Sequence, residues 1–207
     1  MYSQCDEEKY ILEVFKGKIG RFLDIGACDG KTGSNSLALV EQGWSGVLVE
    51  ASPRAFLKLQ DLHLGNEKLV LLNAAVDLCC ELKPFWDGPA ALGYATTEGA
   101  NRAKWEHHCK FQNPFYLVTV SLHRLFNMVG YPAFDFVDID TEGTSVDLFK
   151  AMFPLFVYLA KDKPPLPKMI CIEHDSREGE ILEASIKYGY QEIRAARNPQ
   201  NMLLVRE

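Results

Sequence analysis

The stretch that decides the fold is LDIGACDGKTGSN (residues 23–35), in which an apolar run reaches an acid, Asp24, and two glycines follow. A P-loop needs four residues between its first glycine and the Gly-Lys-Ser/Thr that binds phosphate. Only three residues separate Gly26 from Gly30. A dinucleotide fingerprint needs a glycine where Cys28 stands, because a pyrophosphate must approach the backbone there. The stretch therefore predicts a tight strand-to-helix turn that holds a ligand without a phosphate group.

Apolar runs of strand length alternate with stretches of helical periodicity, which is typical of a parallel sheet covered on both faces. We predict strands over residues 21–25, 46–50, 68–76, 134–140 and 169–173, and helices over residues 34–42, 53–64, 145–159 and 177–188. The turn RNPQN joins residues 190–196 to residues 202–205 as a final hairpin. The predicted fold class is α/β, with a doubly wound, mostly parallel seven-stranded sheet, helices on both faces and a C-terminal antiparallel hairpin strand.

Residues 77–118 interrupt the alternation and contain DGPAALGYATTEGANRAKWEHHCKFQNP. A connection of this length in a compact domain is usually a binding loop or a lid. Its aromatic residues Trp86, Tyr94 and Trp105 favour an ordered segment that covers a substrate. The alternative is a peripheral hairpin with a short helix near residues 103–109. We expect a single domain over residues 1–207, with residues 77–118 as a lid or acceptor-binding insertion.

Composition limits the partners that we expect. The net charge is −6, whereas nucleic-acid-binding domains usually carry a basic excess, so we expect no nucleic-acid partner. The six cysteines include no Cys-x-x-Cys pair, which favours reduced thiols and a cytoplasmic location. We also expect no membrane contact, because no apolar stretch approaches about 18 residues. The sequence leaves the oligomeric state open.

Two acids lie where a doubly wound sheet usually meets a nucleoside. Asp24 ends one apolar run, and Glu50 ends the next, twenty residues after Gly30. An acid at that place accepts hydrogen bonds from ribose hydroxyls. Alternatively, Glu50 is a charge at a helix N-terminus and Asp24 binds N–H groups of its own turn. Asn35 and Ser36 are suited to capping the following helix.

The segment FDFVDIDTEG (residues 134–143) carries three further acids, Asp138, Asp140 and Glu142. Alternate residues of a strand point to one face, so these like charges would repel one another. A cation is therefore expected near them. The cation is either a positive group of a ligand or a divalent metal, for which carboxylate oxygens are suitable ligands.

These segments together resemble the FkbM family of S-adenosylmethionine-dependent methyltransferases, which are mostly O-methyltransferases. Residues 22–59 are similar to its opening motif, FDFVDIDTEG is similar to its Asp-x-Glu-Gly motif, and ICIEHD (residues 170–175) is similar to its next strand. The resemblance is weak across residues 77–118. Cys28 stands where many relatives have Asn, and Asp138 stands where relatives often have a small or apolar residue.

The resemblance implies that the protein binds S-adenosylmethionine and methylates a hydroxyl group of a small molecule or glycan. The predicted cofactor contacts are Asp24, Gly26, Ala27, Gly30, Asn35, Glu50, Ala51, Ala75 and Asp140. The predicted catalytic residues are Asp140, Glu142 and His174, and either Asp140 or His174 would take the proton of the acceptor. A divalent metal, if one is used, would bind Asp138, Asp140 and Glu142.

Several alternatives remain at this stage. His174 fits a structural histidine equally well, and His107 and His108 are the next candidate bases. NPFY (residues 113–116) is similar to the Asn-Pro-Pro-Tyr loop of N-methyltransferases, but it precedes the run YLVTV, and we predict a turn there. An NAD-type oxidoreductase is disfavoured by Cys28 and by the closing hairpin. A non-catalytic S-adenosylmethionine-binding domain is disfavoured because Glu50, Asp140 and Glu142 occur together.

Overall fold

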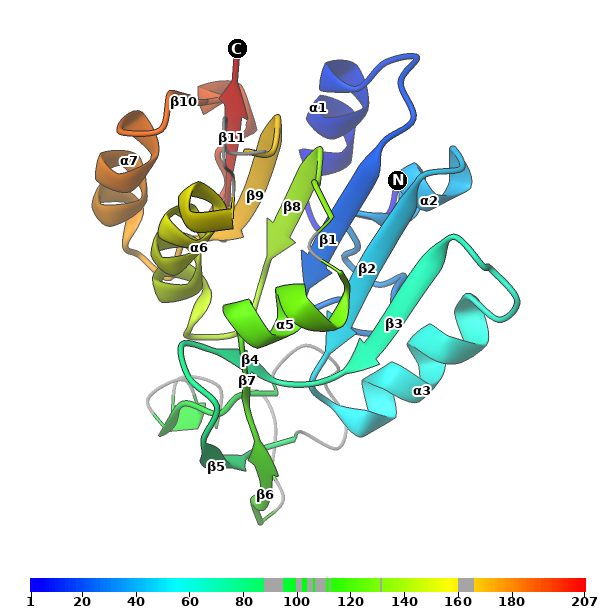
Figure 1. Cartoon of the computed structure of the whole chain (residues 1–207), viewed down its shortest axis with the longest axis vertical. Coiled ribbons are helices and arrows are strands. Elements are labelled where there is room, and N and C mark those ends of the chain that lie inside the picture. The colour runs from blue at the N-terminus through cyan, green and yellow to red at the C-terminus, as the bar shows by residue number, and fades with distance from the viewer. Residues whose placement is uncertain are drawn as a thin grey trace.

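The computed structural model of the 207-residue chain describes residues 1–87, 95–99, 102–103, 106, 111, 113–130, 132–159 and 166–207. At its centre is a seven-stranded sheet in the order β10-β11-β9-β8-β1-β2-β3 (Figure 1). The strands are β1 (Arg21–Ile25), β2 (Ser45–Glu50), β3 (Leu69–Asn73), β8 (Phe136–Ile139), β9 (Met169–Glu173), β10 (Tyr190–Glu192) and β11 (Asn201–Arg206). Only β11 runs opposite to the other strands of this sheet. The predicted fold class is confirmed, including the C-terminal hairpin.

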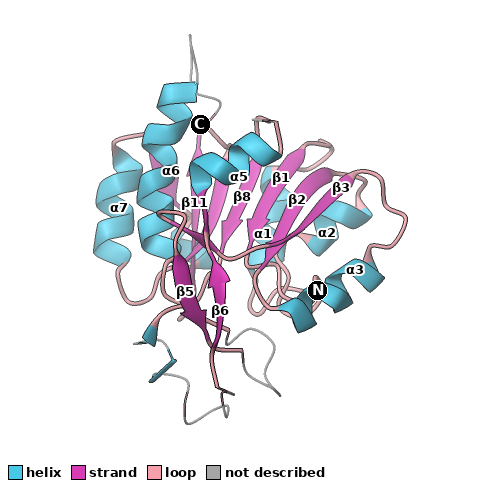
Figure 2. Ribbon diagram, turned by 60° about the horizontal axis from the view of Figure 1, so that its bottom comes forward, coloured by secondary structure: helices cyan, strands magenta, loops and turns pink. Residues whose placement is uncertain are grey.

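Helices cover both faces of this sheet (Figure 2). One layer is formed by α1 (Glu7–Val14), α2 (Leu37–Glu41) and α3 (Pro53–Leu62), and the other by α5 (Leu122–Met128), α6 (Ser145–Leu159) and α7 (Glu178–Ile186). All residues of β8 and β9 are buried, as expected for central parallel strands with helices on both sides. The polar side chains that remain on these strands therefore need a specific environment.

Several predicted elements are shorter in the structure than the sequence pattern suggested. The predicted strand over residues 68–76 is interrupted after Asn73, and Val76–Asp77 form a separate strand, β4, beside β7 (Val120–Ser121). The predicted helix over residues 34–42 begins only at Leu37, the helix over residues 177–188 is α7, and residues 194–196 form a 3₁₀ turn after β10. Helices α1 and α5 were not predicted.

Two strands of the insertion form an antiparallel hairpin, β5 (Leu82–Phe85) with β6 (Phe115–Val118), which projects away from the main sheet (Figure 2). A peripheral hairpin was the alternative prediction for this segment. Phe115 and Tyr116 are the first residues of β6, so the turn predicted for NPFY is wrong. Tyr94, Trp105, His107 and His108 lie outside the described residues, so the lid remains a prediction.

Two further features concern the described part of the chain. No helix there is both long enough and apolar enough to cross a membrane. Its five cysteines, Cys5, Cys28, Cys79, Cys80 and Cys171, are free thiols.

Candidate functional site

A cavity of about 480 Å³ lies at the carboxyl ends of β1, β2, β8 and β9. Strand register gathers acids on one face of the sheet there. Asp24 pairs with Asp138 across β1 and β8, and Asp138 pairs with Cys171 of β9. Alternate strand residues share a face, so Asp140 and Glu173, two residues further along their chains, belong to the same side. The topology thus brings together acids that are far apart in the sequence.

Asp24 and Asp138 are buried and bound by the segment before α2. Asp24 accepts a hydrogen bond from the Ser36 hydroxyl at 2.6 Å, and Asp138 accepts one from the Asn35 amide at 3.0 Å. The expected capping roles of Asn35 and Ser36 are therefore wrong, and the Ser34 hydroxyl instead accepts from the Leu37 N–H. Burial raises the pKa of Asp24 to about 6. Burial and the neighbouring charge of Asp24 raise the pKa of Asp138 to about 8.

Gly26 and Gly30 of this turn each lack room for a Cβ, but for different structural reasons. Gly26 has a φ of +102°, and a Cβ there would lie 1.6 Å from the carbonyl oxygen of Asp140. A Cβ on Gly30 would lie 2.5 Å from Leu59 of α3, so Gly30 packs against the helix and does not line the cavity. All other predicted cofactor contacts line it: Asp24, Gly26, Ala27, Asn35, Glu50, Ala51, Ala75 and Asp140.

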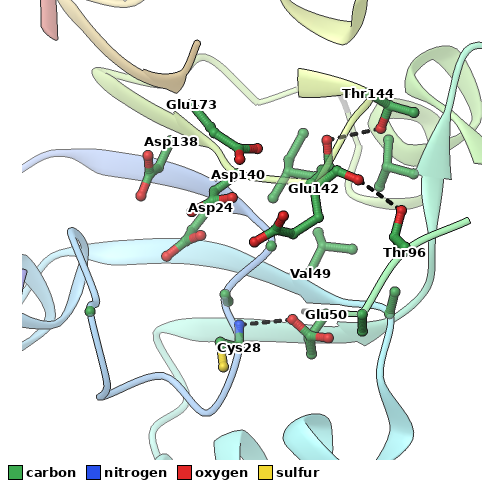
Figure 3. A pocket seen from close by; sticks show the side chains of 18 of the residues that line it. Asp24, Cys28, Val49, Glu50, Thr96, Asp138, Asp140, Glu142, Thr144 and Glu173 are labelled. Atoms are coloured by element: carbon green, nitrogen blue, oxygen red, sulfur yellow. Dashed lines mark hydrogen bonds between the residues drawn. The ribbon is translucent and has the colours of Figure 1, made fainter. Parts of the chain in front are cut away.

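Glu50 fixes the glycine-rich turn from the end of β2. Its carboxylate accepts hydrogen bonds from the backbone N–H of Cys28 at 2.8 Å (Figure 3) and from the backbone N–H of Ser52 at 2.6 Å. Cys28 has a φ of +50°, a region that residues with a Cβ rarely adopt. Burial raises the pKa of Glu50 to about 7 although both hydrogen bonds favour its ionised form. Glu50 thus shapes the turn, and its remaining lone pairs can face a ligand.

Asp140, Glu142 and Glu173 form a second acidic group (Figure 3). Each offers a carboxylate oxygen, and these oxygens lie within 4.8 Å of one another. Burial, followed by the charges of Glu142 and Asp138, raises the pKa of Asp140 well above its usual range. Sequence reasoning grouped Asp138 with Asp140 and Glu142, whereas the structure places Glu173 there. Its position at the end of the strand next to Asp140 was the signal that could have identified it.

His174 lines the same cavity, but its ring is bound on both sides. Its Nδ1 accepts a hydrogen bond from the Ser176 N–H at 3.1 Å, and its Nε2 lies 3.3 Å from the Asn198 carbonyl oxygen. A proton on Nε2 satisfies both contacts. This arrangement connects the loop after β9 to the turn before β11 and favours a structural role. The reserve candidates His107 and His108 lie outside the described residues.

The two ends of the cavity differ in polarity. Near β2 and β3 the wall is apolar except for Glu50, and is formed by Val49, Ala51, Ala74, Ala75 and Val76. The insertion adds Phe85, Ala95, Thr96 and Thr97. Near β8 and β9 the wall is acidic, and none of the described residues that line the cavity is a lysine or an arginine. The site can therefore accommodate a ligand with an apolar end and a cationic end.

Comparison with solved structures shows the fold. The chain is 12% identical to monomeric WbdD, with a TM-score of 0.50, over 99% of this chain and 41% of that chain. It is also 12% identical to the METTL16 methyltransferase domain, with a TM-score of 0.52, over 95% of this chain and 64% of that chain. The chain thus spans less than two thirds of either structure and has the Rossmann-like fold of class I methyltransferases. No protein-family model and no curated protein matches the sequence, so membership of the FkbM family stays a prediction.

Proposed function

We propose that the protein is an S-adenosylmethionine-dependent methyltransferase that methylates a hydroxyl group of a small molecule or glycan. The observation that supports this most is the charge of the cavity wall. Seven carboxyl side chains line it: Asp24, Glu50, Asp138, Asp140, Glu142, Glu173 and Asp175. S-adenosylmethionine carries a sulfonium and an ammonium group and has no phosphate, so it is attracted where a phosphorylated nucleotide would be repelled.

The polarity of the cavity suggests how this cofactor lies in it. Glu50 would accept hydrogen bonds from the ribose hydroxyls, and the apolar wall at Ala51 and Ala75 would contact the adenine. The amino-acid part would pass over Gly26, where no Cβ obstructs it. The sulfonium would then lie toward Asp140. This order follows the change from apolar to acidic lining residues between β2 and β8.

In the proposed reaction the acceptor oxygen forms a bond to the methyl carbon while the bond from that carbon to the sulfonium sulfur breaks. Holding acceptor and methyl group in line can contribute about 7–11 kcal/mol to lowering the barrier. The acceptor proton passes to Asp140, because both ring nitrogens of His174 are already bound. The positive sulfonium favours ionised Asp140 and so prepares it as a base. Glu142 and Glu173 would orient the acceptor.

Other uses of the site remain open to test. A divalent cation would find suitable oxygen ligands at Asp140, Glu142 and Glu173. A domain that binds the cofactor without transferring its methyl group would have the same cavity. The acidic wall also makes a nucleic-acid acceptor unfavourable, since its phosphates would be repelled.

The experiment is transfer of labelled methyl from S-adenosylmethionine to a panel of glycans, small alcohols, amines and RNA, with and without a chelator. Asp140→Asn should lower turnover by about 10²–10⁴ while leaving the affinity for S-adenosylhomocysteine, which lacks the sulfonium charge, nearly intact. Asp61→Asn, on the exposed side of α3, is the matched control and should behave as wild type. Transfer only to amines or RNA would contradict the acceptor class. Cofactor binding without any transfer would support the non-catalytic alternative.

A further inference from the structure

Thr96 of the insertion contacts the backbone of Glu142, one of the three residues of the second acidic group. Its side chain is buried, and its backbone N and O pair with the backbone O and N of Trp86 at 3.1 and 3.0 Å. Its hydroxyl donates to the carbonyl oxygen of Glu142 at 2.8 Å (Figure 3) and accepts from the Glu98 N–H at 2.9 Å. The hydroxyl is therefore held in one orientation, and its single proton points at the Glu142 carbonyl.

The backbone of Glu142 needs such a contact. Glu142 has a φ of +51° and is followed by Gly143 at +117°. A left-handed conformation is disfavoured for a residue with a Cβ and persists where the surroundings fix it. Within the loop, the Ser145 hydroxyl accepts from the Thr141 N–H at 2.9 Å. Thr96 adds a restraint from a separate part of the chain, applied at the strained residue itself.

We propose that Thr96 is a positioning residue: by holding the Glu142 carbonyl, it fixes the Glu142 carboxylate beside those of Asp140 and Glu173. The inference rests on the proposed function, in which these carboxylates meet the acceptor. It assigns the insertion a second role besides contributing to the cavity wall. The insertion sets the geometry of the acidic loop that follows β8, in which Glu142 lies 46 residues after Thr96.

Two substitutions test this proposal, one that removes the hydroxyl of Thr96 and one that keeps it. Thr96→Val should lower kcat/KM for methyl transfer by about 10- to 100-fold, as expected for a misplaced catalytic group, with S-adenosylhomocysteine affinity unchanged. Thr96→Ser keeps the hydroxyl and should restore most of the rate. In a Glu142→Gln background, Thr96→Val should cause no further loss, because the carboxylate that Thr96 is proposed to position is already gone. Losses that add independently would overturn the proposal.

A second readout does not depend on catalysis. Amide hydrogen exchange over residues 141–145 should accelerate in Thr96→Val and in Thr96→Ala, and should stay at the wild-type rate in Thr96→Ser, under conditions where each variant is folded. Unchanged exchange in both hydroxyl-free variants would overturn the positioning role. If wild type transfers no methyl group but the exchange pattern is as expected, the proposed function fails and the positioning role stands.

Discussion

At the scale of single residues, the site is defined by carboxyl groups that are buried close to one another. Burial raises the pKa of Asp24 to about 6, of Glu50 to about 7 and of Asp138 to about 8. In the ligand-free protein these groups therefore lose their protons at a higher pH than ordinary carboxyl groups do. A cationic ligand favours their ionised forms, so its binding should release protons.

Ligand affinity should consequently depend on pH. S-adenosylmethionine should bind more tightly as pH rises from about 5.5 to 8.5, by up to about tenfold per pH unit for each proton released. S-adenosylhomocysteine lacks the sulfonium charge and should show a weaker dependence. Calorimetric titration of both ligands across this range measures the difference. The same dependence of affinity on pH for both ligands would show that the sulfonium charge does not change the ionisation of these carboxyl groups.

The stability of the ligand-free protein should change in the opposite direction. The folded-state pKa of Glu50 is raised from 4.5 to about 7, so between these values the unfolded chain has lost a proton that the folded protein still holds. The free energy of unfolding should therefore fall as pH rises through this window. Thermal unfolding of wild type and Glu50→Gln measures the effect, and the curve should be flatter for the variant. Identical slopes would contradict the raised pKa.

Glu50→Gln should also weaken cofactor binding, because an amide cannot accept from both the Cys28 and Ser52 N–H groups and face the ribose hydroxyls. A hydrogen bond to a charged group contributes about 1.5–3 kcal/mol, so we expect a loss of about 10- to 100-fold. Glu67→Gln, at an exposed turn, is the matched control. Equal affinities in wild type and both variants would mean that Glu50 has only a local structural role.

The residues that sequence reasoning placed correctly in the cavity wall, Asp24 and Glu50 among them, end strands at a characteristic spacing. Gly30 could not be separated from Gly26 in this way, because both follow the same strand and only the position of α3 distinguishes them. Glu173 lies beside Asp140 because β9 pairs with β8 in the sheet. Spacing along the chain does not specify which strands pair. The contact of the His174 ring with the Asn198 carbonyl oxygen likewise could not be predicted, because Asn198 lies in a different loop.

At the scale of elements, the turn after β1 connects the sheet to the cavity. The central strands were predicted because buried parallel strands are continuous apolar runs. Helix α1 was missed because it is short and Ile11 is its sole buried apolar residue, which leaves a weak periodic pattern. Helix α5 did carry a signal, since Leu122, Leu125 and Phe126 have helical spacing after the capping Ser121. The short strands of the insertion depend on pairing between distant segments.

Gly26→Ala tests how tightly the turn is built. An added Cβ would collide with the Asp140 carbonyl oxygen, next to the hydrogen bond from the Asp140 N–H to the Ile25 carbonyl at 2.8 Å. Gly65→Ala is the matched control, because Gly65 also has a positive φ (+77°) but no atom lies within 4 Å of the added Cβ. The control should lose about 1–2 kcal/mol from backbone strain, and Gly26→Ala should lose more and bind cofactor poorly. Denaturant unfolding measures the loss of stability in each variant, and titration measures cofactor affinity. Equal losses of stability in the two variants would contradict the close approach of the Asp140 carbonyl oxygen to Gly26.

At the scale of the whole molecule, a mostly parallel sheet with one antiparallel strand presents its acidic cavity at the carboxyl ends of the strands. This fold is shared with solved structures at 12% identity, so the fold alone does not identify the ligand. The composition of the cavity does discriminate between ligands. Carboxylates repel the diphosphate of a dinucleotide and attract a sulfonium nucleoside. Ligand choice therefore depends on the charge of the cavity wall.

The most direct measurement is the shift in melting temperature on adding S-adenosylmethionine, S-adenosylhomocysteine or NADH to the wild-type protein. Both sulfur nucleosides should stabilise it, by about 2.7 kcal/mol when the ligand is at 100 times its Kd, and NADH should give no shift. An equal shift with NADH, or no shift with either sulfur nucleoside over a wide concentration range, would contradict the assignment of this cavity to S-adenosylmethionine.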